Sequence, residues 1–242
     1  MMATDIVIST YNRLPFLKRT LERLFERTTS PFCLHVIDDA STEGNGAYLQ
    51  GLLDCGMLAG LVLRDKRAHV ATNWHTAAWL ANSDILVYSD DDVLCPQLEP
   101  DWLSRGLTAM AQYPRLGLLA LHNPMCLRSG AIKPIGNEGP LTYCDRVASH
   151  FAFIRRDLMR DIVIPGVGKT LAGVPIYSNG KMIDRAWSYA VRERGYKVAY
   201  LTGVYCQHIG LHSGRTGQDL SQWDMACDAI TLQPLEMQHG RA

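Results

Sequence analysis

The sequence lacks the features that mark secreted, membrane-spanning and strongly charged proteins. Its seven cysteines are odd in number and scattered, without a C-x-x-C pair, which argues against a disulfide framework or a zinc site. No apolar run is long enough to span a bilayer, and the apolar stretch after Asp5 is too short, and lacks the basic flank, for a secretion signal. The 24 basic and 24 acidic residues cancel, so bulk charge favours neither nucleic acid nor an anionic membrane as a partner. We therefore expect a cytoplasmic protein without a transmembrane segment, in which any anion site is local.

Short apolar runs alternate with amphipathic stretches through the first half of the chain. With 242 residues and 47% hydrophobic content, the chain can bury a sizeable core. Strands are predicted over residues 6–9, 34–37, 85–88 and 116–121, and helices from residue 14, from near residue 47, over 70–81 and over 102–113. This order is typical of an α/β protein with a mostly parallel, Rossmann-like sheet flanked by helices.

The second half is less regular and predicts a smaller mixed or antiparallel extension of the sheet. A short strand is expected over 151–154, a helix over 183–194 and a strand over 197–201. Gly195 follows that helix and suits a left-handed C-terminal cap. We expect a single domain over residues 1–242, with a mobile loop over 210–218 and a weakly defined tail beyond it.

Each early strand ends in a polar cluster. The three clusters are Ser9–Arg13, Asp38–Asp39 and Ser89–Asp92. In open α/β sheets, ligands bind outside the carboxyl ends of the strands. We therefore expect the clusters to converge on one site that contains hydroxyls, an aromatic ring, a cation and several carboxylates.

The triplet Asp90–Asp92 is the main sign of metal binding. Adjacent carboxylates repel one another, which raises at least one pKa or requires a cation, and hard oxygen ligands suit Mg²⁺ or Mn²⁺. The competing interpretation is a solvated turn in which one aspartate caps the next helix. The triplet alone does not separate the two interpretations.

Tyr11 and Asp39 follow strands that should be neighbours in the sheet. Ring stacking by the tyrosine and an N–H bond accepted by the aspartate would suit a uracil base, whose imide edge thymine shares. A tyrosine that completes the core and an aspartate that makes a turn explain the same residues when each is taken singly.

Three motifs in a fixed order carry a family resemblance. The stretches VISTYNR at 7–13, VIDDAST at 36–42 and YSDDDVLCP at 88–96 resemble glycosyltransferase family 2. The resemblance is strong over residues 5–120 and weaker as far as residue 210. It implies the GT-A fold and a metal-dependent enzyme that moves a sugar, with inversion, from a nucleotide-sugar donor to an acceptor hydroxyl. Residues 1–120 would bind the nucleotide-sugar, residues 121–210 the acceptor, and residues 211–242 would form a mobile loop and the tail.

By this resemblance the first two motifs bind the nucleotide, and the third binds ribose and metal. Tyr11 and Asp39 correspond to the base-binding residues. Two registers fit the triplet, because alignment through Pro96 puts the metal on Asp91, whereas a literal D-x-D pattern puts it on Asp90 and Asp92. All three aspartates are therefore candidate metal ligands. The donor-binding residues implied by these motifs are Ser9, Thr10, Tyr11, Arg13, Asp38, Asp39 and Asp90.

Two residues of the second half complete the implied site. Asp184 opens the predicted helix and corresponds to the general base, although Ile183 replaces the acid that usually precedes it. His208 resembles a further metal ligand. The competing interpretations are a first-turn acid favoured by the helix dipole for Asp184 and an ordinary structural histidine for His208.

Two arginines are expected at the diphosphate. Arg67 stands where relatives often have glycine, and Arg215 lies on a loop that would close as a lid. The implied partners are a nucleotide-sugar donor, first of all a UDP-sugar, and a glycan, lipid-linked or small-molecule acceptor, with no nucleic acid. A lipid-linked acceptor would require only peripheral membrane contact. Synthesis of a polysaccharide or cell-surface glycan is the expectation at the level of the family.

Three other classes of protein share parts of this pattern. The first is an NTPase or kinase, because Gly166–Thr170 resembles the end of a phosphate-binding loop, but Val163 stands where that loop needs glycine. A nucleotidyltransferase would need a G-x-G loop after its first strand, and Ser9–Asn12 contains no glycine. A non-catalytic nucleotide-sugar-binding protein of the same fold stays open, because Ile183 replaces an expected acid.

Overall fold

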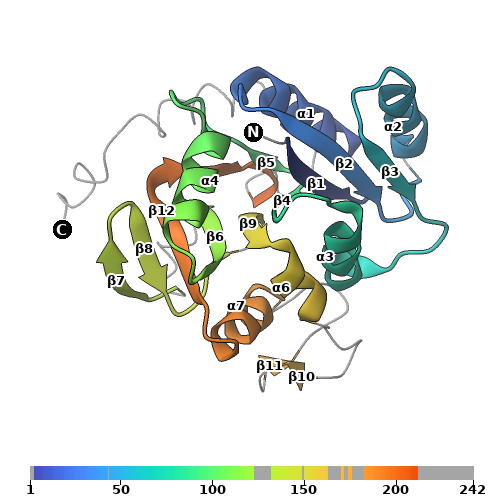
Figure 1. Cartoon of the computed structure of the whole chain (residues 1–242). Coiled ribbons are helices and arrows are strands. Elements are labelled where there is room, and N and C mark those ends of the chain that lie inside the picture. The colour runs from blue at the N-terminus through green and yellow to red at the C-terminus, as the bar shows by residue number, and fades with distance from the viewer. Residues whose placement is uncertain are drawn as a thin grey trace, which may run out of the picture.

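The centre of the protein is a nine-stranded sheet with the order β3-β2-β1-β4-β9-β6-β12-β8-β7 (Figure 1). The computed structural model describes residues 3–42, 44–122, 132–148, 150–162, 170–171, 174–175 and 183–211. Strands β8 and β9 run against all the others in the sheet, so the predicted mostly parallel arrangement is confirmed. The strands are β1 (Thr4–Thr10), β2 (Phe32–Asp38), β3 (Gly60–Leu63), β4 (Ile85–Asp90), β6 (Leu116–His122), β7 (Pro134–Glu138), β8 (Leu141–Cys144), β9 (Phe151–Arg155) and β12 (Lys197–Tyr205).

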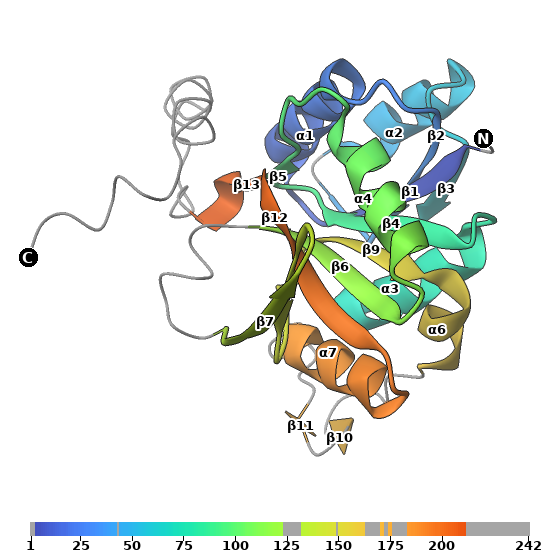
Figure 2. The same cartoon turned by 60° about the vertical axis from the view of Figure 1, so that its left-hand side comes forward.

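Helices cover both faces of this sheet and enclose two apolar cores (Figures 1 and 2). One face carries α1, α2 and α4, and the other carries α3, α6 and α7. No helix in the described ranges has the length and apolar character that crossing a bilayer requires. The helices are α1 (Leu14–Arg27), α2 (Asn45–Asp54), α3 (His69–Leu80), α4 (Trp102–Gln112), α6 (Arg156–Asp161) and α7 (Ile183–Glu193).

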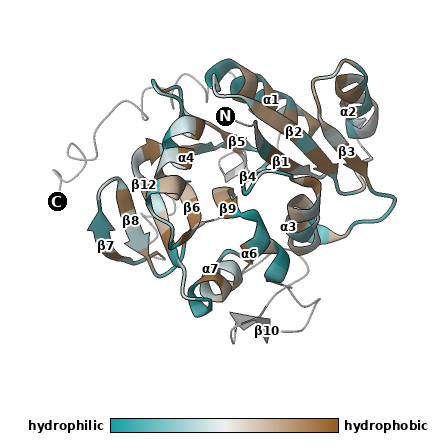
Figure 3. Ribbon diagram, viewed as in Figure 1, coloured by the Kyte–Doolittle hydropathy of each residue, from teal (hydrophilic) through white to brown (hydrophobic). Residues whose placement is uncertain are grey.

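Successive residues of the central strands enter opposite cores. In β1, Ile6 and Ile8 lie in the core under α1, α2 and α4, whereas Val7 lies in the core under α3, α6 and α7. Because both faces are covered, the middle of the strand is apolar at three consecutive positions, Ile6 to Ile8, which is the pattern that predicted it. Figure 3 shows apolar residues (brown) along β1, β2 and β6 and polar residues (teal) on β7 and α6.

The elements that the sequence did not predict are short or polar. β3 is only four residues long, so its apolar run is too short to stand out, and every residue of β7 is exposed, so that strand has no buried apolar face. β12 continues past residue 201 because a bulge between Leu201 and Tyr205, with Gly203 at a φ of 75°, keeps it paired with β6. Gly195 has a φ of 78° and ends α7 as predicted, and the N–H groups of Gly195 and Tyr196 bond to Arg192 and Val191 in a Schellman cap.

The chain after β12 returns to the carboxyl end of β4. β13 (Gln207–His208) pairs antiparallel with β5 (Val93–Leu94), and a 3-10 helix, η1 (Ile209–Leu211), follows directly. The prediction of a loop from residue 210 was wrong for its first residues, because the Ile209 N–H bonds to the Asp92 carbonyl at 2.9 Å and anchors η1. The rest of that loop, with Arg215, lies outside the described residues.

The phosphate-binding-loop alternative is excluded by the backbone. Thr170 begins β10 (Thr170–Leu171), which pairs antiparallel with β11 (Val174–Pro175). A phosphate-binding loop requires the lysine and threonine to open a helix, whose N-terminus holds the anion. A strand at Thr170 does not supply that N-terminus.

Candidate active site

The parallel register brings the three polar clusters together at one edge of the sheet. Thr10 lies opposite Asp38 in β2, and Ser9 lies opposite Asp90 in β4. The last residues of β1, β2 and β4 are therefore neighbours. This is the convergence expected from the carboxyl ends of parallel strands.

The adjacent acids Asp91 and Asp92 share one internal counter-ion. Both side chains are buried, and the Arg13 guanidinium forms ion pairs with each of them. Thr10 also donates its hydroxyl to Asp91 at 2.7 Å. Burial would lower the pKa of Arg13, but the charges of Asp91, Asp92 and Asp90 raise it. Arg13, expected to contact the donor, is bound to the acid cluster in this structure.

Asp90 and Asp91 remain difficult to ionise despite this arginine. Burial raises the pKa of Asp90 well above its ordinary value, and the charge of Asp92 adds to the effect. Burial also raises the pKa of Asp91 to about 7, although Arg13 acts in the opposite direction. One guanidinium therefore does not balance three acids, which leaves room for a second cation.

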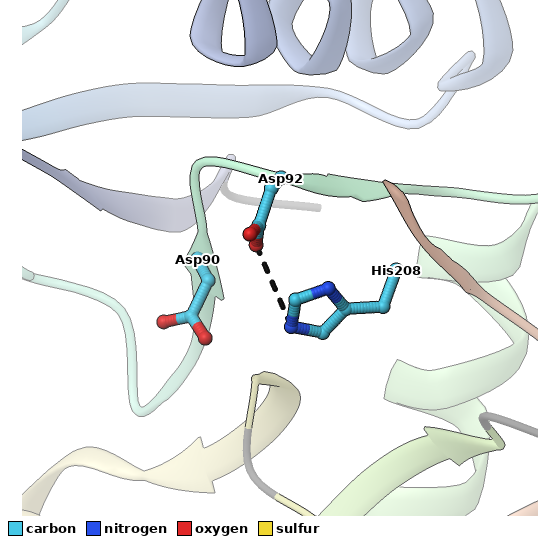
Figure 4. A group of neighbouring side chains, drawn as sticks. All are labelled: Asp90, Asp92 and His208. Atoms are coloured by element: carbon cyan, nitrogen blue, oxygen red, sulfur yellow. Dashed lines mark ion pairs between the residues drawn. The ribbon is translucent and has the colours of Figure 1, made fainter. Parts of the chain in front are cut away.

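The side chains of Asp90, Asp92 and His208 form a group that fits a divalent cation. One ligand atom from each lies within 4.8 Å of the others, and Figure 4 shows the His208 ring directed at Asp92. Asp92 Oδ1 is buried and accepts no hydrogen bond within the part of the chain that the structure describes. His208 Nε2 lies 3.6 Å from that oxygen, too far for a hydrogen bond and close enough for two ligands of one ion.

Tertiary pairing creates this group from residues far apart in the sequence. His208 lies opposite Val93 in the β13–β5 pair, next to Asp92. Of the two registers left open by the triplet, the literal D-x-D pattern matches the group. Asp91 lies outside it, because its two carboxylate oxygens are engaged by Arg13 and Thr10. A pair of carboxylates with one imidazole is a donor set that accepts Mn²⁺ or Mg²⁺.

A second cluster lies beside the first, around Asp39. Its carboxylate accepts the N–H groups of Ala68 and His69 at 2.7 and 2.9 Å. The Arg67 guanidinium lies 3.8 Å from Asp39 and 3.8 Å from the centre of the Tyr11 ring, so it stacks on that tyrosine. Tyr11, Asp39 and Arg67 thus lie together, as a base site would require. Arg67, which was expected at the diphosphate, is stacked on the Tyr11 ring in this structure.

Three further residues expected at the donor bond to the protein itself. Ser9 shares a 2.6 Å hydrogen bond with the Tyr88 hydroxyl, and Asp38 accepts the Ser41 hydroxyl at 2.5 Å. Thr10, besides its bond to Asp91, accepts a bond from Asn45 at 3.2 Å. Their buried side chains tie β1 to β4 and fix the loop that follows β2.

Asp184 lies in the first turn of α7 and is partly exposed. Its charge is among those that add to the effect of burial in raising the pKa of Asp90, so the two carboxylates interact electrostatically. α7 is held there by Trp187, which packs on Trp74 of α3 with ring centres 5.1 Å apart. The position is that of a group able to take a proton beside the cation group.

The sequence did not predict two residues at the site. His150 precedes β9, and its ring meets the His208 ring edge to face with centres 4.9 Å apart. Burial lowers the pKa of His150 to about 4, and His208 contributes to that shift. Arg64 lies 3.7 Å from Asp39. Neither belongs to a motif, and a lone histidine before an apolar strand carries no local signal.

Comparison with known proteins agrees with this architecture. The model of glycosyl transferase family 2 matches residues 5–126. No curated protein is similar enough to count as a match. Among solved structures, the mannosyltransferase PcManGT from Pyrobaculum calidifontis, in complex with GDP-Man and Mn²⁺, is 20% identical with a TM-score of 0.63, over 94% of this chain and 62% of that one.

Two further structures share the fold at lower identity. GalNAc-T7 with UDP, GalNAc and Mn²⁺ is 13% identical with a TM-score of 0.63, over 86% of this chain and 44% of that one. TarS 1–349 from S. aureus in complex with UDP-GlcNAc is 14% identical with a TM-score of 0.57, over 95% of this chain and 66% of that one. This chain thus spans less than two thirds of the length of PcManGT and of GalNAc-T7. The fold is GT-A, and the chain belongs to glycosyltransferase family 2.

Proposed function

We propose that this chain transfers a sugar from a nucleotide-sugar donor to an acceptor hydroxyl, with a divalent cation bound by Asp90, Asp92 and His208. The observation that carries the proposal is the group that these three side chains form at the carboxyl edge of a GT-A sheet. Structures of similar fold support it, because PcManGT is described with GDP-Man and Mn²⁺, and TarS with UDP-GlcNAc.

In this proposal the cation and its ligands act on the leaving group. Bound Mn²⁺ or Mg²⁺ would stabilise the negative charge on the departing nucleoside diphosphate. The β5–β13 pair places the backbones of Asp92 and His208 side by side, so the two ligands are brought together before the ion binds. Asp91 acts indirectly, because it fixes Arg13 and Thr10 beside the group.

The nucleotide base is assigned to Tyr11, Asp39 and Arg67. The guanidinium covers one part of the Tyr11 ring, so a base stacks either on the opposite face or after the arginine swings towards the diphosphate. Asp39 already accepts two backbone N–H groups, and its remaining lone pairs are those that an imide N–H would use. We take UDP as the nucleotide, and thymine would satisfy the same groups. Arg215 stays in the proposal as a diphosphate ligand.

Asp184 is assigned as the general base. Its carboxylate would take the proton of the acceptor hydroxyl while that oxygen attacks the anomeric carbon from the face opposite the leaving group. A single displacement inverts the configuration of that carbon. Residues 1–120 would then form the donor half and residues 121–210 the acceptor half, and the acceptor would be a growing glycan in polysaccharide or cell-surface synthesis.

Ligand binding and turnover test the proposal separately. UDP with Mn²⁺ at about one hundred times its Kd should stabilise the protein by about 2.7 kcal/mol, a rise of roughly 5–10 °C in Tm for a chain of this size. Asp184→Asn should keep that shift yet lower Mn²⁺-dependent transfer or donor hydrolysis by about 10²–10⁴. A shift that is the same without metal would overturn the metal assignment. Turnover unchanged in Asp184→Asn would overturn the base, and binding without any turnover in the native chain would identify a non-catalytic binding protein.

A further inference from the structure

His150 contacts two of the three residues assigned to the cation. Its carbonyl accepts the backbone N–H of Asp90 at 2.9 Å, and its ring lies edge to face on the ring of His208. His150 itself is absent from the group of ligand atoms that fits an ion. It therefore touches both sides of the group without being one of its ligands.

The sheet gives His150 a rigid position. The next residue, Phe151, pairs with Ser89 of β4 and is buried, and its ring packs against Trp102 of α4 with centres 4.8 Å apart. His150 is therefore anchored to the central strands, whereas His208 lies on a strand of only two residues. The contact between the two rings therefore restrains His208, the ligand with the shorter strand.

We propose that His150 is a positioning residue, which holds the His208 ring in the orientation that binds the divalent cation. The inference rests on the proposed metal group and extends it by one residue. An unsupported imidazole on a short strand would rotate about its side-chain torsions, and each alternative rotamer would turn Nε2 away from Asp92. Residues that orient metal-binding histidines typically change metal affinity by about 10–100-fold when they are replaced.

Calorimetric titration of the purified chain with Mn²⁺ alone tests this directly. We expect His150→Ala to raise the Kd for Mn²⁺ about tenfold, and His150→Phe, which keeps an aromatic ring against His208, to stay within about threefold of the native value. His208→Ala is the reference for loss of the ligand. His75→Ala is the matched control, because that ring also meets an aromatic edge to face, at Trp79, and should leave the Kd unchanged.

Each failure has a distinct pattern. If His208→Ala weakens Mn²⁺ binding but His150→Ala does not, the positioning role is wrong and the metal group stands. If His150→Phe binds as weakly as His150→Ala, ring packing is not what His150 supplies, and the inference is overturned. If neither His208→Ala nor His150→Ala changes the Kd, the metal group and the inference fail together.

Discussion

Arg13 should act as the internal counter-ion of the acid cluster when no metal is bound. Its guanidinium pairs with Asp91 and Asp92, whose side chains are 0% and 1% exposed. Breaking a buried ion pair by removing one partner costs about 3–5 kcal/mol, and this arginine is 42% exposed, so water offsets part of the loss. We therefore expect Arg13→Met to lower the free energy of unfolding by about 2–3 kcal/mol in the presence of EDTA.

The effects of Mn²⁺ and of pH on the stability of Arg13→Met provide two further tests of this prediction. A cation that no longer competes with the guanidinium should bind the variant more tightly, so Mn²⁺ should stabilise Arg13→Met more than the native chain. Burial raises the pKa of Asp91 to about 7, above its value in the unfolded chain, so ionised Asp91 destabilises the fold and stability is lost as pH rises through 7. The loss in the variant should therefore be smaller at pH 6 than at pH 8.

Urea unfolding followed by tryptophan fluorescence, at both pH values and with EDTA or Mn²⁺, measures all three effects. Lys197→Met is the control, because its partner Glu138 lies on the surface and an exposed pair contributes little. Equal urea midpoints for Arg13→Met and the native chain in EDTA would refute the counter-ion role. A smaller stabilisation of the variant by Mn²⁺ would show instead that Arg13 assists metal binding.

Two more predictions follow from single positions. Gly210→Ala would place a Cβ 1.9 Å from Asp92 Oδ2, so either Asp92 or η1 must move, and the Kd for Mn²⁺ should rise at least tenfold. Gly136→Ala is the control, because its Cβ meets nothing within 4 Å and should leave the Kd unchanged. Equal Kd values for the two variants would contradict the crowding argument. Burial lowers the pKa of His122 to about 4 from about 6.5, so stability present above pH 6.5 is lost as pH falls towards 4. In urea unfolding, the free energy of unfolding of His122→Phe should therefore fall by about 2 kcal/mol less than that of the native chain between pH 7.5 and pH 5. Equal losses in the two proteins would show that His122 is hydrated and would contradict the argument.

The central strands and the end of α7 were readable from local patterns. The central strands are covered on both faces, so they appear in the sequence as continuous apolar runs, and Gly195 marks the end of α7 by its left-handed conformation. β7 was missed because its residues are exposed, and η1 was missed because a hydrogen bond to distant Asp92 holds it.

Local patterns were enough to predict that Tyr11, Asp39 and Asp90–Asp92 meet, because parallel strands bring their carboxyl ends to one edge. The contacts that each side chain makes there became visible in the three-dimensional fold. Arg13 neutralises Asp91 and Asp92, and His150 supports His208, through contacts between residues separated by many tens of positions. Such pairings depend on strand register and on the direction of each side chain, and neither leaves a periodic signal in the chain.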